Sequence, residues 1–163
     1  MFKKYYFIIF ILLITACSST FKVVVLPKQL QDNRLFKIEQ QDNKNNVIQG
    51  SLLSIQFENE QWRWVQVDPL GSPIARVLLS KKGWKNDGFV MPNAQAQQLF
   101  YAIATGINPK QPLLDFSEIQ TIPNGHIYWI KSKKVWKILQ KKHILYITLA
   151  DGSHWKVEEI NRG

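Results

Sequence analysis

Residues 51–67 read SLLSIQFENEQWRWVQV, and this stretch decides the fold. Leu53, Ile55 and Phe57 alternate with polar residues, which is the period of a β-strand that buries one face. Residues 58–60, Glu-Asn-Glu, then interrupt the alternation and predict a hairpin turn. The stretch therefore predicts two antiparallel strands joined by a short turn.

The second of these strands, predicted over residues 61–67, places Trp62 and Trp64 on the same face. Asp68-Pro69-Leu70-Gly71 follows, and its proline has no N–H to donate to a sheet, so the strand ends there. Residues 74–79, IARVLL, predict the next strand, and Asn86-Asp87-Gly88 predicts a tight turn after it.

One segment has the period of a helix. Asn93 suits the N-cap position, Gly106 suits the left-handed position after the last turn, and residues 93–105 between them predict the helix. Its apolar stripe consists of Leu99, Phe100 and Ile103. The prolines that follow predict a rigid loop and leave room for a second short helix over 113–118.

The C-terminal third returns to strands. Pro123-Asn124-Gly125 and Asp151-Gly152 are turn sequences. Four antiparallel strands are predicted over residues 126–131, 135–140, 143–150 and 154–160. The whole pattern predicts an α+β fold, with a large antiparallel sheet packed against one or two helices. Residues 144–149 are apolar on both faces, which fits either a buried core strand or a strand that lines a cavity.

The N-terminal residues have the layout of a secretory signal peptide. Lys3 and Lys4 precede an unbroken apolar run over 5–14, and small residues follow it. Ile14-Thr15-Ala16-Cys17 resembles the lipobox of bacterial lipoproteins. A plain signal peptide with a coincidental cysteine, or an uncleaved anchor, is the alternative, although the apolar run is short for a membrane span.

The lipobox resemblance implies that residues 1–16 are a cleaved lipoprotein signal peptide and that Cys17 carries acyl chains such as palmitate. Residues 17–27 would form a lipidated N-terminus and short tether, and residues 28–163 a single domain. By the sorting rule of such lipoproteins, Ser18 after the cysteine implies the periplasmic face of the outer membrane.

The charge is strongly basic, with 21 Lys and Arg against 12 Asp and Glu, a net charge of +9. Removal of residues 1–16 leaves 163 − 16 = 147 residues and, with two lysines lost, a net charge of +7. An exported basic protein does not meet nucleic acid, so its anionic partners are lipid head groups, lipopolysaccharide phosphates or acidic proteins. Solubility alone explains the charge equally well. Cys17 is the lone cysteine, so no disulfide within the chain supports the fold.

The stretch from Val67 to Val77, VDPLGSPIARV, resembles the LolA/LolB-like family, which includes the LolB outer-membrane lipoprotein receptors. Trp84, Gly88-Phe89 and the helix after Pro92 resemble more closely an uncharacterised lipoprotein family found beside aryl polyene biosynthesis genes. This resemblance implies an unclosed half-barrel with helices over its hollow, whose concave apolar face holds an acyl chain. Leu70 would then lie in a loop comparable to the one with which LolB delivers lipoproteins into the bilayer.

These observations favour a non-catalytic carrier of a hydrophobic or amphipathic ligand: an acyl chain, a lipoprotein or a lipid-linked polyene. Candidate ligand-binding residues are the apolar positions of the predicted hairpin and helix: Leu53, Ile55, Phe57, Trp62, Trp64, Leu99 and Ile103. The tryptophans are equally expected as ordinary core residues of a small β-rich domain. The alternative function is a structural or assembly lipoprotein that binds a protein partner through a sheet edge or a basic face.

Catalytic and cofactor chemistry finds no support in the sequence. His126, His143 and His154 lie beside predicted turns, lack metal-ligand spacing and are expected to be solvated. The chain contains no Gly-x-Ser-x-Gly elbow. We therefore expect a protein that is not an enzyme and that carries no cofactor or metal.

The densest basic run lies in the C-terminal third: Lys131, Lys133, Lys134, Lys137, Lys141 and Lys142. A turn at Ser132-Lys133 is expected to divide it. The run fits either a patch that faces anionic lipid or a solvated outer face of the sheet, and the second interpretation is favoured.

Overall fold

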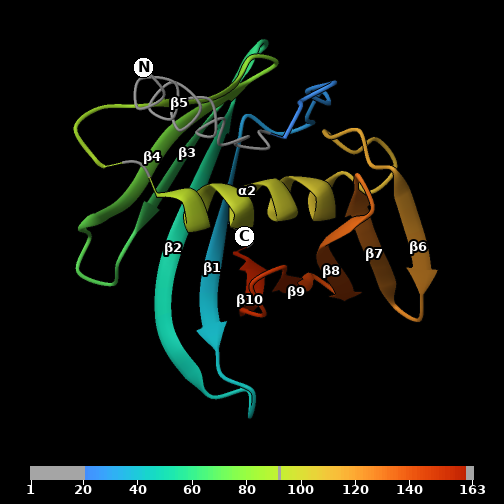
Figure 1. Cartoon of the computed structure of the whole chain (residues 1–163). Helices are drawn as coiled ribbons and strands as arrows, with labels where there is room; N and C mark the ends of the chain where they lie inside the picture. The colour runs from blue at the N-terminus through green and yellow to red at the C-terminus, as the bar shows by residue number, and fades with distance from the viewer. Residues whose placement is uncertain (1–20, 92, 161–163) are drawn as a thin grey trace, which may run out of the picture.

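The computed structural model describes residues 21–91 and 93–160, which form one curved antiparallel sheet with a helix across it (Figure 1). In this part of the chain, ten strands pair in the order β5-β4-β3-β2-β1-β10-β9-β8-β7-β6. The strands are β1 Asn33–Gln41, β2 Val47–Phe57, β3 Gln61–Val67, β4 Pro73–Ser80, β5 Gly83–Asn86, β6 Glu118–Ile122, β7 Gly125–Ile130, β8 Lys133–Lys141, β9 Ile144–Leu149 and β10 His154–Glu159. The helix α2 spans Ala94–Ile107. The predicted α+β fold, an open curved antiparallel sheet covered by a helix, is confirmed.

The connectivity explains why α2 lies on the concave face. Strands β1 to β5 form a meander that runs outward, and β6 to β10 form a second meander that returns to pair with β1. The helix joins the outer strands β5 and β6, so its segment has to cross the whole width of the sheet (Figure 1). Nine strand spacings amount to roughly 43 Å in a flat sheet. The 14 residues of α2 span about 21 Å, and the loops at both ends complete the crossing.

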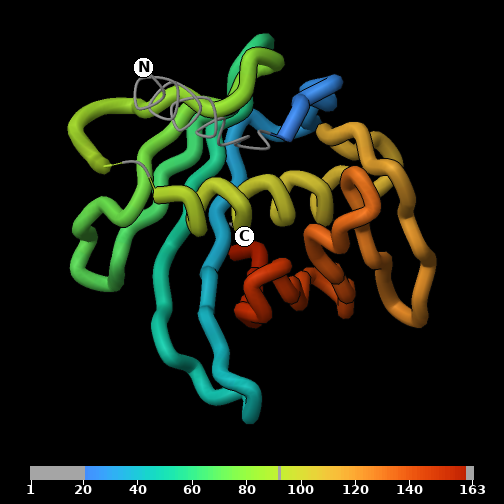
Figure 2. The backbone as a smooth tube through the Cα atoms, viewed as in Figure 1, coloured from blue at the N-terminus to red at the C-terminus, as the bar shows by residue number. Residues whose placement is uncertain are grey.

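The concave face is the hydrophobic core. Cross-strand pairs such as Ile55↔Trp64 and Trp64↔Val77 place successive apolar side chains in register beneath the helix. The buried inward-facing side chains include Phe36, Ile38, Leu53, Ile55, Trp62, Trp64, Val77, Leu79, Ile138, Leu145, Ile147 and Val157. Each large apolar side chain buried in this way stabilises the fold by about 1.5–3 kcal/mol. Figure 2 shows how the sheet curves around this face and how the β1–β2 hairpin extends beyond its neighbours.

The predicted hairpin over residues 51–67 is confirmed, and its turn is closed by the Glu58 N–H donating to the Gln61 carbonyl at 3.0 Å. The predicted helix is also confirmed, with Asn93 as N-cap: its side-chain oxygen accepts from the Ala96 N–H at 3.0 Å. The predicted end of the helix is wrong, because Gly106 lies inside α2. A Cβ at Gly106 would lie 2.7 Å from Leu145 Cδ1, so the glycine allows helix and sheet to approach closely.

Two further local predictions are wrong. Asn86-Asp87-Gly88 makes no hairpin turn: β5 ends at Asn86, and the chain leaves the sheet toward α2. Residues 113–118 form no helix, because their backbone is engaged with the N-terminal segment instead. The Val24 N–H donates to the Leu113 carbonyl at 2.8 Å, and Val23 forms a bridge with Leu114.

The four predicted C-terminal strands are confirmed as β7 to β10, whereas β6 was not anticipated. The turn expected at Ser132-Lys133 lies one residue earlier, where Lys131 and Ser132 have φ of 48° and 64°. Within the segment expected as a tether up to Pro27, Val23 is buried in the core at 5% exposure. None of the helices among the described residues is long and apolar enough to cross a membrane.

Candidate functional site

The structure gathers all seven predicted ligand-binding residues on the concave face. Leu53, Ile55, Trp62 and Trp64 project from β2 and β3, and all four are buried. Two more buried residues, Leu99 and Ile103, belong to α2. Phe57 is half-buried at the rim, where its ring packs edge-on against Trp62 with centroids 4.9 Å apart.

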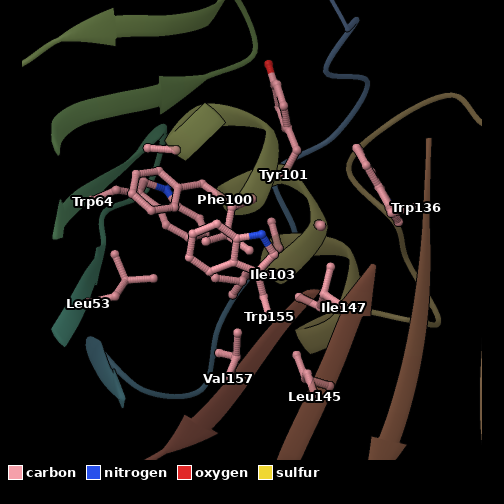
Figure 3. Packing of buried hydrophobic residues seen from close by; sticks show 14 of the residues in the cluster. Leu53, Trp64, Phe100, Tyr101, Ile103, Trp136, Leu145, Ile147, Trp155 and Val157 are labelled. Atoms are coloured by element: carbon pink, nitrogen blue, oxygen red, sulfur yellow. The ribbon is translucent and has the colours of Figure 1, made fainter. Parts of the chain in front are cut away.

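These residues surround an aromatic cluster to which α2 and β5 also contribute. Phe100 stacks on Trp64, with ring centroids 5.0 Å apart and planes 21° apart (Figure 3). Trp84 of β5 packs edge-on against Trp64 at 5.8 Å and against Phe100 at 6.0 Å. On the next residue of the helix, Tyr101 lies 4.9 Å from Trp84. The candidate site is thus a filled apolar layer between one helix and the sheet.

Sequence reasoning named neither Phe100 nor Trp84 as a site residue. Phe100 was recognisable as part of the apolar stripe of the predicted helix. Trp84 had no such pattern, because β5 has only four residues. The opposite edge of the same layer contains a buried polar pair, in which Gln66 Nε2 donates to Ser51 Oγ at 2.8 Å.

Several buried polar atoms of the core have no hydrogen-bond partner in the described part of the chain. They are the indole Nε1 atoms of Trp64, Trp84 and Trp136 and the hydroxyl Oη of Tyr101. An unsatisfied buried polar group costs about 1–3 kcal/mol. Burial also raises the pKa of Tyr101 to about 12, so its hydroxyl remains a neutral donor. An apolar layer with unused donors is suited to an amphipathic molecule that has a few acceptor oxygens.

Two loops on this half of the sheet present apolar side chains to solvent. Leu70, in the loop between β3 and β4, is 92% exposed, and Asp68 Oδ1 fixes the loop by accepting the Leu70 N–H at 2.9 Å. Phe89 and Met91 are also exposed, in the loop between β5 and α2. Val77, in the middle of β4, pairs with Asn86, so the second loop leaves the sheet at mid-strand, whereas the loop with Leu70 leaves at the ends of β3 and β4. Sequence reasoning identified Leu70 alone.

The outer face of β9 borders a separate hollow of about 540 Å³. Tyr146 and Thr148 line it together with Lys137, Lys141 and Lys156, and Lys156 is held by two carboxylates at 3.4–3.5 Å. The inward side chains of β9 are buried in the core. Strand β9 is therefore a core strand whose other face lines this open polar hollow.

The histidines do not come together. His143 is exposed, whereas His126 and His154 are half-buried, so the expectation that all three are solvated is wrong for two of them. His154 Nδ1 lies 3.2 Å from Thr148 Oγ1, a contact that accounts for its position. Among residues 21–91 and 93–160, no group of three or more His, Cys, Asp or Glu is placed to hold a metal ion. Cys17 and Pro92 lie outside the described residues.

The fold and the layer beneath α2 define an open-sheet α+β protein with an apolar, aromatic-rich interior face. No model of a known protein family matches the chain, and no curated protein matches it.

Proposed function

We propose that this chain is a lipid-anchored, non-catalytic carrier of an amphipathic ligand at the periplasmic face of the outer membrane. The observation that carries the proposal is the cover of the concave face: in the described part of the chain, one helix lies over an apolar layer that extends across both halves of the sheet. A ligand chain that replaces the helix on this layer keeps the apolar surface out of water.

Loading of such a ligand requires α2 to move, because its side chains fill the layer. Leu99, Phe100 and Ile103 are buried against the sheet. Residues 87–91 before the helix and residues 108–117 after it belong to no strand of the sheet, so displacement of the helix leaves the strand pairing intact. An acyl chain in the place of these three side chains would make apolar contacts with the same residues of the sheet.

The unpartnered donors support a ligand with a polar end. Trp84 Nε1 and Tyr101 Oη belong to side chains in direct contact and face no acceptor among the described residues. A carboxylate, ester or hydroxyl oxygen of the ligand would accept from them, which would remove part of the cost of their burial. The ligand class proposed is therefore an acyl chain or lipid-linked polyene that bears oxygen at one end. The resemblance to LolA/LolB-like lipoproteins supports the same class, with the anchor at Cys17 and Leu70 as a membrane-contacting residue.

The test is native mass spectrometry of the mature chain without the anchor, purified from its own cells, with lipid extraction of what dissociates. Uptake of a fluorescent polyene fatty acid is measured on the same sample. A stoichiometric acyl or polyene ligand is the expected result. A ligand-free mass together with no uptake of the probe would overturn the proposal.

One observation favours a second function, an assembly lipoprotein that binds a protein strand. Strand β6 is an edge strand among the described residues and is exposed along most of its length, with Ile119 43% exposed. Such an edge can pair with a strand of another chain. Photo-crosslinking from position 119 in cells, with position 70 as the control, tests this function: a protein adduct at position 119 alone supports it, and its absence excludes this edge.

A further inference from the structure

The N-terminal end of the described chain is fixed tightly to the domain. Val23 is buried, and the Val24 N–H donates to the Leu113 carbonyl at 2.8 Å. The ring of Phe21 packs edge-on against Tyr101 and Trp136, at 5.4 and 5.6 Å. Residues 21–24 are therefore packed directly against the domain.

A hollow of about 420 Å³ lies directly beside this fixed segment. Its apolar lining consists of Phe21, Ile130 and Val135. Its polar lining comes from Lys22 of the N-terminal segment, Lys131 and Lys133 of the β7–β8 turn, and Asp115 and Ser117 of the segment before β6. The hollow therefore combines an apolar side with a basic rim.

The charge at this hollow is uncompensated. Three lysines against Asp115 leave a net charge of +2, and none of the three has a carboxylate within ion-pair distance in the described ranges. All three lysines are exposed at the rim. In the hollow on the outer face of β9, by contrast, Glu39 and Glu158 hold one of the three lysines, Lys156.

The position of the hollow is set by the proposed anchor. Cys17 precedes Phe21 by four residues, a reach of at most about 14 Å for an extended chain. A lipid on Cys17 therefore holds the membrane surface close to this hollow and its three lysines. This reach allows the lysines to come within the Debye length of the lipid phosphates, which is about 8 Å at physiological ionic strength.

We propose that this hollow binds the phosphate head group of an anionic lipid in the membrane that holds the anchor. The phosphate oxygens would lie among Lys22, Lys131 and Lys133, and the first carbons of the lipid would lie against Phe21 and Ile130. Each lysine near an anionic surface contributes about fivefold to the binding constant. The site would orient the domain on the membrane. This inference rests on the lipid anchor of the proposed function.

The test uses the full mature chain reconstituted in lipid nanodiscs, made of phosphatidylcholine alone or with phosphatidylglycerol added. Its intact mass is recorded first, and amide hydrogen exchange is then followed over residues 113–117 and 129–134. We expect slower exchange of both segments in the discs with phosphatidylglycerol, and loss of this difference at high salt. The variant K131Q/K133Q should lose it, whereas K137Q/K141Q, which removes the same charge from the outer face of β8, should keep it.

Equal exchange in both kinds of disc would overturn the head-group site, and so would protection that appears over residues 68–72 instead. Protection by inorganic phosphate in phosphatidylcholine discs would also overturn it, since a free anion would then suffice. A mature chain without acyl mass contradicts the anchor itself. An acylated chain with equal exchange contradicts the head-group site alone.

Discussion

Truncation of Phe100 to alanine tests whether the layer beneath α2 can accept an acyl chain. Phe100 is fully buried, stacks on Trp64 and packs edge-on against Trp84. Truncation of a buried phenylalanine costs about 3–5 kcal/mol. At about 2–4 °C per kcal/mol for a domain of this size, Phe100→Ala should lower the Tm by roughly 10 °C.

The carrier hypothesis adds a second expectation, because a chain-like ligand can occupy the space that the ring leaves. A ligand at one hundred times its Kd stabilises the folded state by about 2.7 kcal/mol. A long-chain fatty acid should therefore recover more than half of the loss in Phe100→Ala, and raise its Tm more than that of the unaltered protein. Thermal unfolding with and without the fatty acid measures both effects.

Leu113→Ala is the matched control. Leu113 is equally buried, but it lies in the segment after α2, where its carbonyl accepts the Val24 N–H, and it makes no part of the stack of Phe100 on Trp64. Its truncation costs about 2–5 kcal/mol, and the fatty acid should not restore it preferentially. Equal recovery of both variants, or recovery of neither, would refute the reasoning that links the layer to acyl binding.

Two further predictions concern the sheet. Gly125→Ala should destabilise the fold by several kcal/mol in urea unfolding, since its Cβ would lie 2.0 Å from the Ile138 carbonyl oxygen and force β7 away from β8. The control Gly50→Ala should be neutral or stabilising, because nothing lies within 4 Å of its Cβ. Equal effects of the two substitutions on stability would contradict the close approach of β7 and β8. The two hydrogen bonds from Arg34, both 2.7 Å, hold the pKa of Glu159 below its ordinary 4.5, so the stability they provide is present above about pH 4.5 and is lost as the pH falls through the lowered pKa. Arg34→Gln should reduce this loss of stability at acid pH, as measured by unfolding from about pH 7 to about pH 3. An unchanged dependence of stability on pH would contradict this role of the pair.

The long strands were predictable because each buries one face of an alternating pattern. Residues 51–67 have this pattern in both strands, with an interruption at residues 58–60, and both strands and their turn form as expected. Strand β6 has no such pattern, because it is an exposed edge strand whose side chains are almost all in solvent. It forms through backbone pairing with β7, and residue type says little about that pairing.

Most residues of the candidate site could be predicted from the sequence, but whether the layer between helix and sheet is filled or empty could not. Leu53, Trp64 and Ile103 meet because strand and helix periods place them on facing surfaces. Whether they line an empty space depends on how closely α2 approaches, and that distance depends on Gly106 against Leu145. The sequence alone does not show that Gly106 needs to lack a Cβ, because that need arises only from the packing of the helix against β9. The unpartnered indole and hydroxyl groups are likewise a property of the packed layer.

The segment that leads to the proposed anchor also contacts the helix that covers the layer. Phe21 packs edge-on against Tyr101 of α2 on one side and against Trp136 of β8 on the other. Displacement of α2 has to break the contact with Tyr101, whereas Trp136 stays with the sheet. If Cys17 carries the proposed lipid, this contact joins the movable helix to the segment that the anchor holds. A carrier that exchanges an acyl ligand with the membrane would need its cover to open near its anchor, and the proposed anchor at Cys17 precedes this contact by four residues.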